Sequence, residues 1–399
     1  MTSVASSVPP AQAAKQAPVP MLDLKRQYES IKDDVAAALE RVLTTQYFIG
    51  GPELEAFERE SSDYLGAMDC VGCASGTDAL WLALSAAGVL PGDRVITPPF
   101  TFFASASSIT RCEATPVFAD IDPATFNLDP AAVEKILSKS PPVRAMMPVH
   151  LYGQCADMDA LAAIAEQHGT AIVEDAAQAF GANWRGKKAG TLGSAAAFSF
   201  YPTKNLSAYG DGGAVSTNDS ELAAHVRRLR NHGSCQRYYH EEIGWNSRLD
   251  AIQAAILRVK LKHIDRWNQQ RRAIAANYDT LFRDSGLVKN AAIVVDTQAP
   301  IALLQTRPEA FHIYHQYVVR AHRRDDLRAF LTDRGIGTEI YYPVPLHLQQ
   351  CFVYLGYKPG DLPESERTAK EALALPIFPE LRDDEQQRVV AAITEFYSR

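Results

Sequence analysis

The pattern of apolar and polar positions divides the chain into two regions of different character. In the first region, short apolar runs of strand length alternate with segments of helical periodicity. The runs that we expect to be strands are residues 71–73, 94–97, 115–120, 145–150, 171–174, 195–200 and 213–217. Such alternation is typical of an α/β fold with a mainly parallel sheet that helices cover on both faces.

Helical periodicity accounts for most of the remaining apolar positions. We expect helices over residues 31–42, 53–65, 77–87, 157–168 and 248–267. The helix at 77–87 is apolar almost all round, which predicts that it is buried. The helix at 248–267 is the longest, and it carries a regular apolar face.

The second region shows a different order of elements. Strands are expected at 316–320 and 338–342, with a helix at 325–334 between them and a last helix at 384–397. We therefore expect a large α/β domain over 21–265 and a smaller C-terminal α+β domain over 266–399. Residues 1–20 are rich in Ala, Pro, Ser and Gln, which predicts a flexible N-terminal arm.

Composition excludes several classes of protein. The 399 residues carry a formal net charge of −7, so no basic footprint for nucleic acid is present. The sequence has no apolar run of about 18 residues, and its first twenty residues lack the apolar core of a secretory signal. We expect a cytoplasmic protein with no membrane and no nucleic-acid partner.

The cysteine content also indicates a cytoplasmic protein. Six cysteines in a chain of this length are sparse, which suits a reducing compartment. Cys70 and Cys73 form a C-x-x-C pair, which is found in redox motifs and in zinc sites. No second pair and no histidine cluster follows at ligand spacing, so we expect buried thiols and no metal.

Candidate chemistry lies just after the expected strands, because ligands of such sheets bind beyond the carboxyl ends of the strands. After the first strand, Ser75, Gly76 and Thr77 open the buried helix. A helix N-terminus offers free N–H groups and a positive dipole end, which suit a phosphate. The alternative is that Ser and Thr only cap the helix, as they do in many proteins.

An acidic residue, Asp175, follows the expected strand at 171–174. A buried carboxylate needs a cationic partner, and a protonated pyridine nitrogen is one. Gln178 follows three residues later, where its amide could bond a hydroxyl oxygen of the same ring. The alternative for Asp175 is an ordinary acidic residue in the first turn of a helix.

A lysine and an aromatic residue complete the candidate set. Lys204 leaves the strand at 195–200 through a proline-containing turn, and a desolvated lysine is a nucleophile able to form a Schiff base. Ser199 is a second candidate for a phosphate. Phe102 follows the strand at 94–97 and could stack on a pyridine ring. The alternatives are a surface lysine and an aromatic residue of the core.

Four runs in this order carry a resemblance to a known family. They are CASGTDAL at 73–80, VEDAAQA at 173–179, SFYPTKNLSAYGDGGA at 199–214 and GWNSRLDAIQAA at 244–255. The chain from residue 21 to its end resembles the DegT/DnrJ/EryC1/StrS family of sugar aminotransferases, which depend on pyridoxal phosphate. The resemblance implies the aspartate-aminotransferase fold, type I among such enzymes, and a homodimer with shared active sites.

The resemblance also implies roles for individual residues. Lys204 would hold pyridoxal 5'-phosphate as a Schiff base, and Asp175 would pair with its pyridine nitrogen. The other expected cofactor contacts are Gly76, Thr77 and Ser199 to the phosphate, Gln178 to the ring oxygen O3′, Phe102 stacked on the ring, and Asn246 to the phosphate of the partner subunit. The expected substrate contacts are Arg248, Tyr314, His315, Gln316, Tyr341 and His347.

The family likeness implies transfer of an amino group from L-glutamate to a nucleotide-linked keto-sugar. A Phe-Tyr-Pro run before Lys204 and Tyr-Gly-Asp after it look more like members that act at C3 than at C4 of the sugar. A 4-keto-sugar aminotransferase and a non-catalytic PLP-binding regulatory protein remain the alternatives. A dehydratase branch has a histidine in place of the lysine, so Lys204 argues against it.

Overall fold

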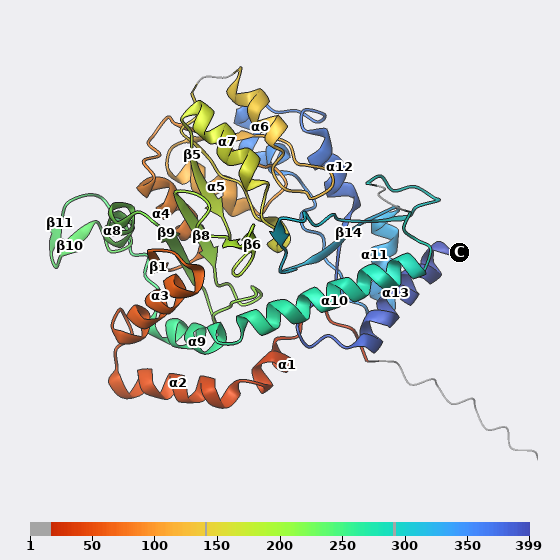
Figure 1. Ribbon diagram of the computed structural model, residues 1–399, viewed down its shortest axis with the longest axis horizontal. Helices are drawn as coiled ribbons and strands as arrows, with labels where there is room; N and C mark the ends of the chain where they lie inside the picture. The colour runs from red at the N-terminus through yellow and green to blue at the C-terminus, as the bar shows by residue number, and fades with distance from the viewer. Residues whose placement is uncertain (1–16, 140–141, 290–292) are drawn as a thin grey trace, which may run out of the picture.

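The computed structural model describes residues 17–139, 142–289 and 293–399. Its largest sheet has seven strands in the order β1-β9-β8-β5-β4-β2-β3 (Figure 1). Their bounds are β1 Asp69–Cys73, β9 Gly213–Thr217, β8 Ala195–Ser199, β5 Ala171–Asp175, β4 Ala145–Met146, β2 Arg94–Thr97 and β3 Thr115–Phe118. Only β9 runs antiparallel to its neighbours. The expectation of a mainly parallel sheet is confirmed, and the ends of β1, β2, β5 and β8 lie along one edge.

Helices pack on both faces of this sheet, because successive strand residues point to opposite sides. Val71 and Val173 face α4 (Gly76–Ala86), α5 (Phe103–Arg111) and α8 (Ser220–Leu229) in one apolar cluster. Their chain neighbours Cys70 and Ile172 face the other way. The helices of that second face are α3 (Pro52–Leu65), α6 (Pro130–Leu137), α7 (Met158–His168) and α9 (Ala251–Leu261).

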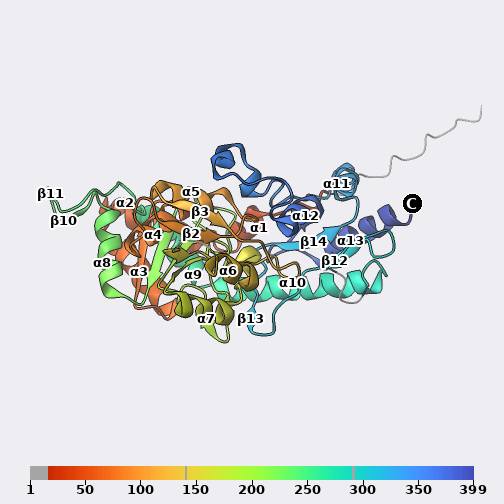
Figure 2. The same ribbon diagram turned by 90° about the horizontal axis from the view of Figure 1, so that it is seen from above.

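Several smaller elements surround the sheet. Near the N-terminus lie α1 (Leu24–Glu29) and α2 (Lys32–Thr45), and α2 packs on α9. A hairpin of β10 (Ser234–Gln236) and β11 (Tyr239–His240) projects from one end of the molecule (Figure 2). A small sheet joins β6 (Asn183–Trp184), β7 (Lys187–Lys188) and β13 (Ala310–Phe311). Short 3-10 helices are η1 (Leu151–Gly153), η2 (Leu346–Leu348) and η3 (Gln350–Leu355).

The expected single helix at 248–267 is wrong. The structure has two helices here, α9 and then α10 (Ile264–Asp284). The backbone amide of His263 bonds the carbonyl of Lys260 at 2.9 Å, which closes α9, and α10 starts at the next residue. The apolar periodicity continues across this break and no Pro or Gly marks it, so the pattern alone does not reveal it.

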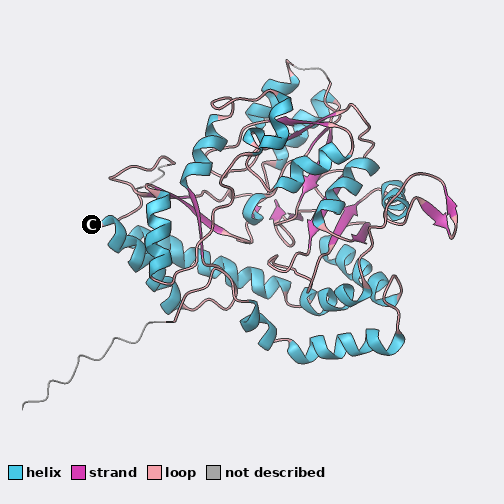
Figure 3. Cartoon of the chain, turned by 180° about the vertical axis from the view of Figure 1, so that it is seen from behind, coloured by secondary structure: helices cyan, strands magenta, loops and turns pink. Residues whose placement is uncertain are grey.

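The C-terminal region has its own sheet and core. Its antiparallel sheet is β12-β14-β15, and α10 leads into it from the large sheet (Figure 3). The bounds are β12 Ile301–Leu303, β14 Tyr317–Ala321, β15 Ala372–Leu375, α11 Arg324–Asp333, α12 Pro363–Glu371 and α13 Asp383–Tyr397. Trp267 packs with α2 and α9, whereas Ile274 and Tyr278 belong to the C-terminal core. We therefore propose a domain boundary near residue 266, at the start of α10.

Two expectations at the edges of this region are wrong. Residues 338–342 form no strand: Glu339 makes a single bridge with Ala374, and Pro343, which has no N–H, follows within a few residues. Residues 17–20 are not a free arm, because Val19 is buried and bonds both Gly335 and Gly337 at 2.8 Å. The rest of the expected arm, 1–16, lies outside the described residues.

Two simpler findings complete the fold. Across the described ranges, no helix is both long enough and apolar enough to cross a membrane. Cys70 and Cys73 are buried free thiols, and burial raises the pKa of both above the usual value. A thiol that resists ionisation is a poor ligand and a poor nucleophile, which agrees with the structural role expected for this pair.

Candidate active site

The end of β1 and the end of β8 meet at the N-terminus of α4. Ser75 caps this helix by accepting a hydrogen bond from the Asp78 amide at 3.1 Å. Gly76 lies against Ser199, because a Cβ added to Gly76 would be 2.5 Å from the Ser199 Cβ. Only glycine fits at such an approach. Backbone N–H groups and hydroxyls thus lie together at the N-terminus of α4, and the Thr77 hydroxyl is unpaired in the described part of the chain.

Asp175 ends β5 as a buried carboxylate with a defined orientation. Its Oδ2 accepts a hydrogen bond from the Ser105 hydroxyl at 2.7 Å, and its Oδ1 accepts one from the Ala177 amide at 3.2 Å. Burial raises the pKa of Asp175, while these hydrogen bonds and the charge of Lys204 oppose the rise. A carboxylate held in this way can pair with a cation that enters the site.

Lys204 lies in the turn that follows β8, close enough to Asp175 for their charges to interact. Burial lowers the pKa of Lys204 to about 8, and the charge of Asp175 limits this decrease. Within the described residues its amine has no hydrogen bond or ion pair. A share of the amine is therefore neutral near pH 7 and free to attack a carbonyl.

The turn carrying Lys204 rests on a buried polar network. The next residue, Asn205, donates to the Asn268 Oδ1 at 2.8 Å and bonds the Nδ1 of His315 at 3.0 Å. Burial, with the charges of Lys204 and Arg271, holds the pKa of His315 well below its usual value. His315 is thus a neutral, buried neighbour of Lys204. Its expected contact with substrate stays a prediction, and the network shows a supporting role that the sequence did not reveal.

A second group of contacts joins the two regions of the chain at Gln178. The amide oxygen of Gln178 accepts from the Tyr152 backbone N–H at 2.7 Å, and its nitrogen donates to the Tyr342 hydroxyl at 3.1 Å. The ring of Phe102 is 57% exposed and lies 6.2 Å from the Tyr342 ring. Phe102 is therefore available to stack on a ligand. Sequence reasoning named Tyr341 and missed Tyr342, its neighbour.

The other expected substrate residues fall into separate environments. Tyr341 accepts from Gln316, whose Oε1 has no partner among the described residues. Tyr314 stacks on His312 at 3.8 Å and bonds Thr306. His347 is 1% exposed, and its Nε2 bonds Glu366 at 3.2 Å. Because His347 is buried, little of its surface is accessible to a substrate. A direct contact would require the segment that carries His347 to move.

Asn246 and Arg248 lie near Ser75, the residue that caps the N-terminus of α4. Both line a hollow of about 490 Å³ together with Ser75. Ser247, between them, donates to Asp78 at 2.7 Å and so fixes this segment against α4. Asn246 itself is exposed, and the Nε of Arg248 has no partner in the described part of the chain.

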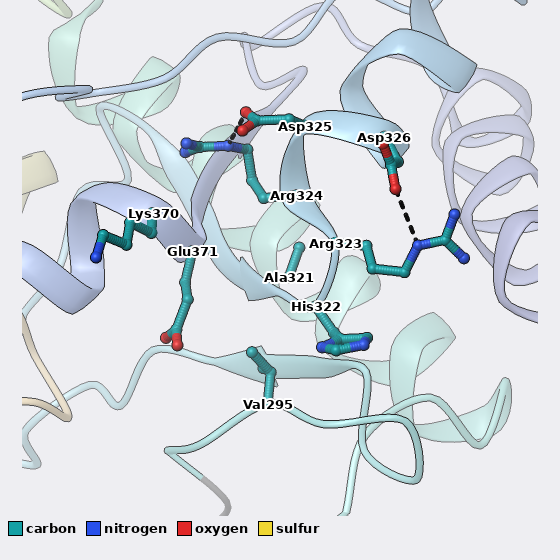
Figure 4. A pocket seen from close by; sticks show the side chains of 9 residues that line it. All are labelled: Val295, Ala321, His322, Arg323, Arg324, Asp325, Asp326, Lys370 and Glu371. Carbon is teal, nitrogen blue, oxygen red and sulfur yellow. Dashed lines mark hydrogen bonds and ion pairs between the residues drawn. The ribbon is translucent and has the colours of Figure 1, made fainter.

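A surface pocket of about 340 Å³ in the C-terminal region is a different feature (Figure 4). Arg324 bonds Asp325 at 2.7 Å and Arg323 bonds Asp326 at 3.0 Å, so much of its charge is paired internally. Glu371 at its edge pairs with the buried Arg320. None of the expected site residues lines this pocket, and we do not assign it to the chemistry.

The residues at the sheet edge fit pyridoxal phosphate. The N-terminus of α4, where Gly76 lies against Ser199, suits a phosphate, and the buried carboxylate of Asp175 suits a protonated ring nitrogen. The unpaired amine of Lys204 suits a Schiff base. Each group is of the required type and lies beyond a strand of one sheet, which defines a pyridoxal-phosphate enzyme of fold type I.

Comparison with known proteins gives the family. A sequence model of the DegT/DnrJ/EryC1/StrS aminotransferase family matches residues 29–394. The chain therefore belongs to this family, and it is an aminotransferase whose cofactor is pyridoxal phosphate, as in solved structures of the fold that hold the cofactor. The fold class, the cofactor and the enzyme class expected from the sequence are confirmed.

Individual relatives carry two kinds of name. A protein of Geobacillus stearothermophilus called a pleiotropic regulatory protein is 52% identical, covering 95% of this chain and 98% of its own. A dTDP-3-amino-3,4,6-trideoxy-alpha-D-glucose transaminase of Streptomyces venezuelae is 47% identical over 96% of this chain and 97% of its own. The crystal structure of DesV from S. venezuelae, in complex with a ketimine intermediate, matches with a TM-score of 0.90 and 46% identity, covering 96% and 100% of the two chains.

Proposed function

We propose that this enzyme transfers the amino group of L-glutamate to C3 of a nucleotide-linked 3-keto-hexose. The observation that carries the chemistry is that the unbonded Lys204 amine and the buried Asp175 carboxylate lie at one sheet edge, close enough for their charges to interact. The sugar and the C3 position are supported by the name of the S. venezuelae transaminase. The Phe-Tyr-Pro and Tyr-Gly-Asp runs that flank Lys204 support the same position.

Bound pyridoxal phosphate supplies an electron sink for the bond changes at the amino carbon. The chain itself supplies position and proton movement. Lys204 first binds the cofactor, and its freed amine, with a lowered pKa, then takes and returns a proton at the donor carbon. Asp175, fixed by Ser105, keeps the ring nitrogen protonated. The N-terminus of α4 and Ser199 hold the phosphate.

The regulatory name of one relative gives a second candidate function. A regulatory protein that binds the cofactor without catalysis does not require a proton-transferring amine beside an oriented carboxylate. This chain retains both Lys204 and Asp175, so we favour the enzyme. A 4-keto-sugar substrate is the remaining alternative for the position of amination.

We further propose a homodimer in which Asn246 contacts the phosphate bound by the partner subunit. Asn246 is exposed and forms a bridge with Asn231, just before β10 of the hairpin that projects from the molecule (Figure 2). Exposed apolar side chains lie in this hairpin and just after it, including Tyr238, Ile243 and Trp245. Apolar surface of this kind favours association. We also propose a cytoplasmic location, which the six free cysteines support.

The test is a product assay. The purified enzyme is given L-glutamate with a matched pair of nucleotide-linked 3-keto and 4-keto hexoses, and the aminated carbon is found by NMR. We expect a C3 amine at a rate well above that at C4. Amination at C4 alone would replace the proposal by its alternative. Cofactor binding with no amination of either sugar would favour the regulatory function.

A further inference from the structure

The hydroxyl of Tyr342 is a polar group without an assigned role, in a loop of the C-terminal region. It touches the large region through one hydrogen bond, the 3.1 Å bond from Gln178 Nε2. The Tyr342 ring also lies 6.2 Å from the Phe102 ring and 6.1 Å from the Phe100 ring. The hydroxyl is therefore next to Gln178 and Phe102, which we expect to face the cofactor.

The orientation of Gln178 decides which way this hydroxyl donates. The Gln178 Oε1 accepts the backbone N–H of Tyr152 at 2.7 Å, so its NH₂ group must face Tyr342. The oxygen of Tyr342 is then an acceptor toward Gln178, and its own proton needs another acceptor. No such acceptor occurs among the described residues. The second N–H of Gln178 is also uncommitted.

Two free donors thus lie side by side, the O–H of Tyr342 and the remaining N–H of Gln178. Burial, together with the negative charge of Asp175, raises the pKa of Tyr342, although the Gln178 bond opposes this. The hydroxyl is therefore protonated near neutral pH and remains a donor. Two neighbouring donors, 3.1 Å apart, suit a single anionic oxygen.

We propose that Tyr342 is a further cofactor-binding residue, whose hydroxyl donates to the ring oxygen O3′ of pyridoxal phosphate beside the amide of Gln178. This inference rests on the proposed function, in that Lys204 must carry the cofactor. Asp175 ends β5, and Gln178 lies three residues later in the turn that follows. One short segment and one loop residue would therefore contact both the ring nitrogen and the ring oxygen. The C-terminal region thereby contacts the cofactor directly.

The expected consequence is a change in the pKa of the Lys204 Schiff base, which can be measured. Donors to O3′ favour its charged form, and they do so most when the conjugated Schiff base nitrogen has lost its proton. Two donors therefore lower the pKa of the Lys204 Schiff base relative to one. Loss of one hydrogen bond to a charged group should raise that pKa by about one unit. The readout is the pH at which the visible absorbance band changes, which needs no substrate.

The experiment compares Tyr342→Phe with Tyr341→Phe in the full-length holoenzyme. Tyr341 is the matched control, because its hydroxyl bonds Gln316 and not Gln178. We expect the absorbance titration of Tyr342→Phe to move to higher pH by about one unit. The titration of Tyr341→Phe should follow that of the wild type. Cofactor content and far-ultraviolet circular dichroism of both variants confirm that the proteins are folded.

Site-specific 3-fluorotyrosine at position 342 provides a second measurement if Tyr342→Phe fails to fold. A more acidic hydroxyl donates more strongly, so the Schiff base pKa should fall. A visible band in the wild type with an unchanged titration in Tyr342→Phe, or in the fluorotyrosine protein, would overturn the inference alone. Absence of a visible band in the wild type would instead overturn the proposed function of Lys204.

Discussion

The two sides of the site are built in different ways. On the cofactor side, Gly76, Asp175 and Ser199 lie at the ends of strands or on the first turn of a helix that a strand leads into. Backbone hydrogen bonds of a seven-stranded sheet fix their positions. On the substrate side, Tyr314 and Tyr341 lie in segments outside any helix or strand. In the proposed function, a rigid sheet would hold the reacting groups, while loops would provide the contacts that can vary with the substrate.

The two sides also differ in charge. Lys204 and Asp175 are ionisable groups whose pKa values burial shifts in opposite senses, downward for the amine and upward for the carboxyl. The substrate side presents neutral donors and acceptors, such as the Tyr314 hydroxyl and the Gln316 amide. Changes on the cofactor side should therefore act on the chemical step, and changes on the substrate side on substrate binding.

The largest expected effect is that of Lys204→Ala. Without this amine neither the covalent bond to the cofactor nor the proton transfer is possible, so we expect no measurable turnover. The measurement is amino-sugar formation by coupled assay. Lys260→Met is the control, because Lys260 is a second buried lysine, whose pKa burial lowers to about 7, but its amine donates to Ser207 and lies over the Tyr209 ring. Robust multiple turnover by Lys204→Ala would contradict the assignment.

Asp175→Asn should have the next largest effect. The amide keeps the shape of the side chain but cannot hold a proton on the ring nitrogen. Loss of one partner of a buried ion pair costs about 4 kcal/mol, which corresponds to a decrease in kcat on the order of a thousand-fold. Ser105→Ala removes the orienting hydrogen bond and the contact with the Thr101 hydroxyl, but leaves the charge of Asp175, and should cost roughly tenfold. Equal losses in the two variants would mean that the charge of Asp175 is unimportant.

Asn246→Asp tests whether the cofactor side is completed by a partner subunit. A negative charge beside the phosphate should weaken cofactor retention about tenfold, a change of roughly 1.4 kcal/mol. Dialysis followed by pyridoxal phosphate titration measures this. Asn218→Asp adds the same charge at an exposed position, where the side-chain oxygen still accepts from the Met68 amide. If both variants retain the cofactor equally, the shared-site proposal is wrong.

Tyr314→Phe should have the smallest effect, and one of a different kind. It removes a hydroxyl that bonds Thr306 at 3.0 Å on the substrate side. Loss of the proposed neutral hydrogen bond from this hydroxyl to the sugar, about 1 kcal/mol, should raise KM for the sugar roughly fivefold. The half-reaction with L-glutamate should be unchanged. A slower glutamate half-reaction would show that the two sides are not separable as described.

The same contrast explains what the sequence could predict. The strand at 94–97 and the positions of Asp175 and Lys204 follow from local patterns, because strand ends in a parallel sheet share one edge. Other features depend on contacts between residues far apart in sequence. They are the bond of Tyr342 to Gln178, the bridge of Val19 to Ile336 and the network around Asn205. No local periodicity encodes such contacts.

Two errors have simple local causes. The apolar stripe runs unbroken through His263, so one helix was expected where α9 and α10 meet. The run Thr338 to Tyr342 has β-branched and aromatic residues typical of a strand. Its only pairing in the described residues is the bridge of Glu339 with Ala374, because the loop turns toward Gln178 instead.

The most direct test of the central claim is the visible absorbance of the purified protein before and after L-glutamate is added without sugar. The account predicts a visible band that fades while a near-ultraviolet band of the aminated cofactor grows. Borohydride reduction before glutamate should attach the cofactor to Lys204 and not to Lys260. No band after addition of pyridoxal phosphate, and no borohydride label on Lys204, would contradict the account.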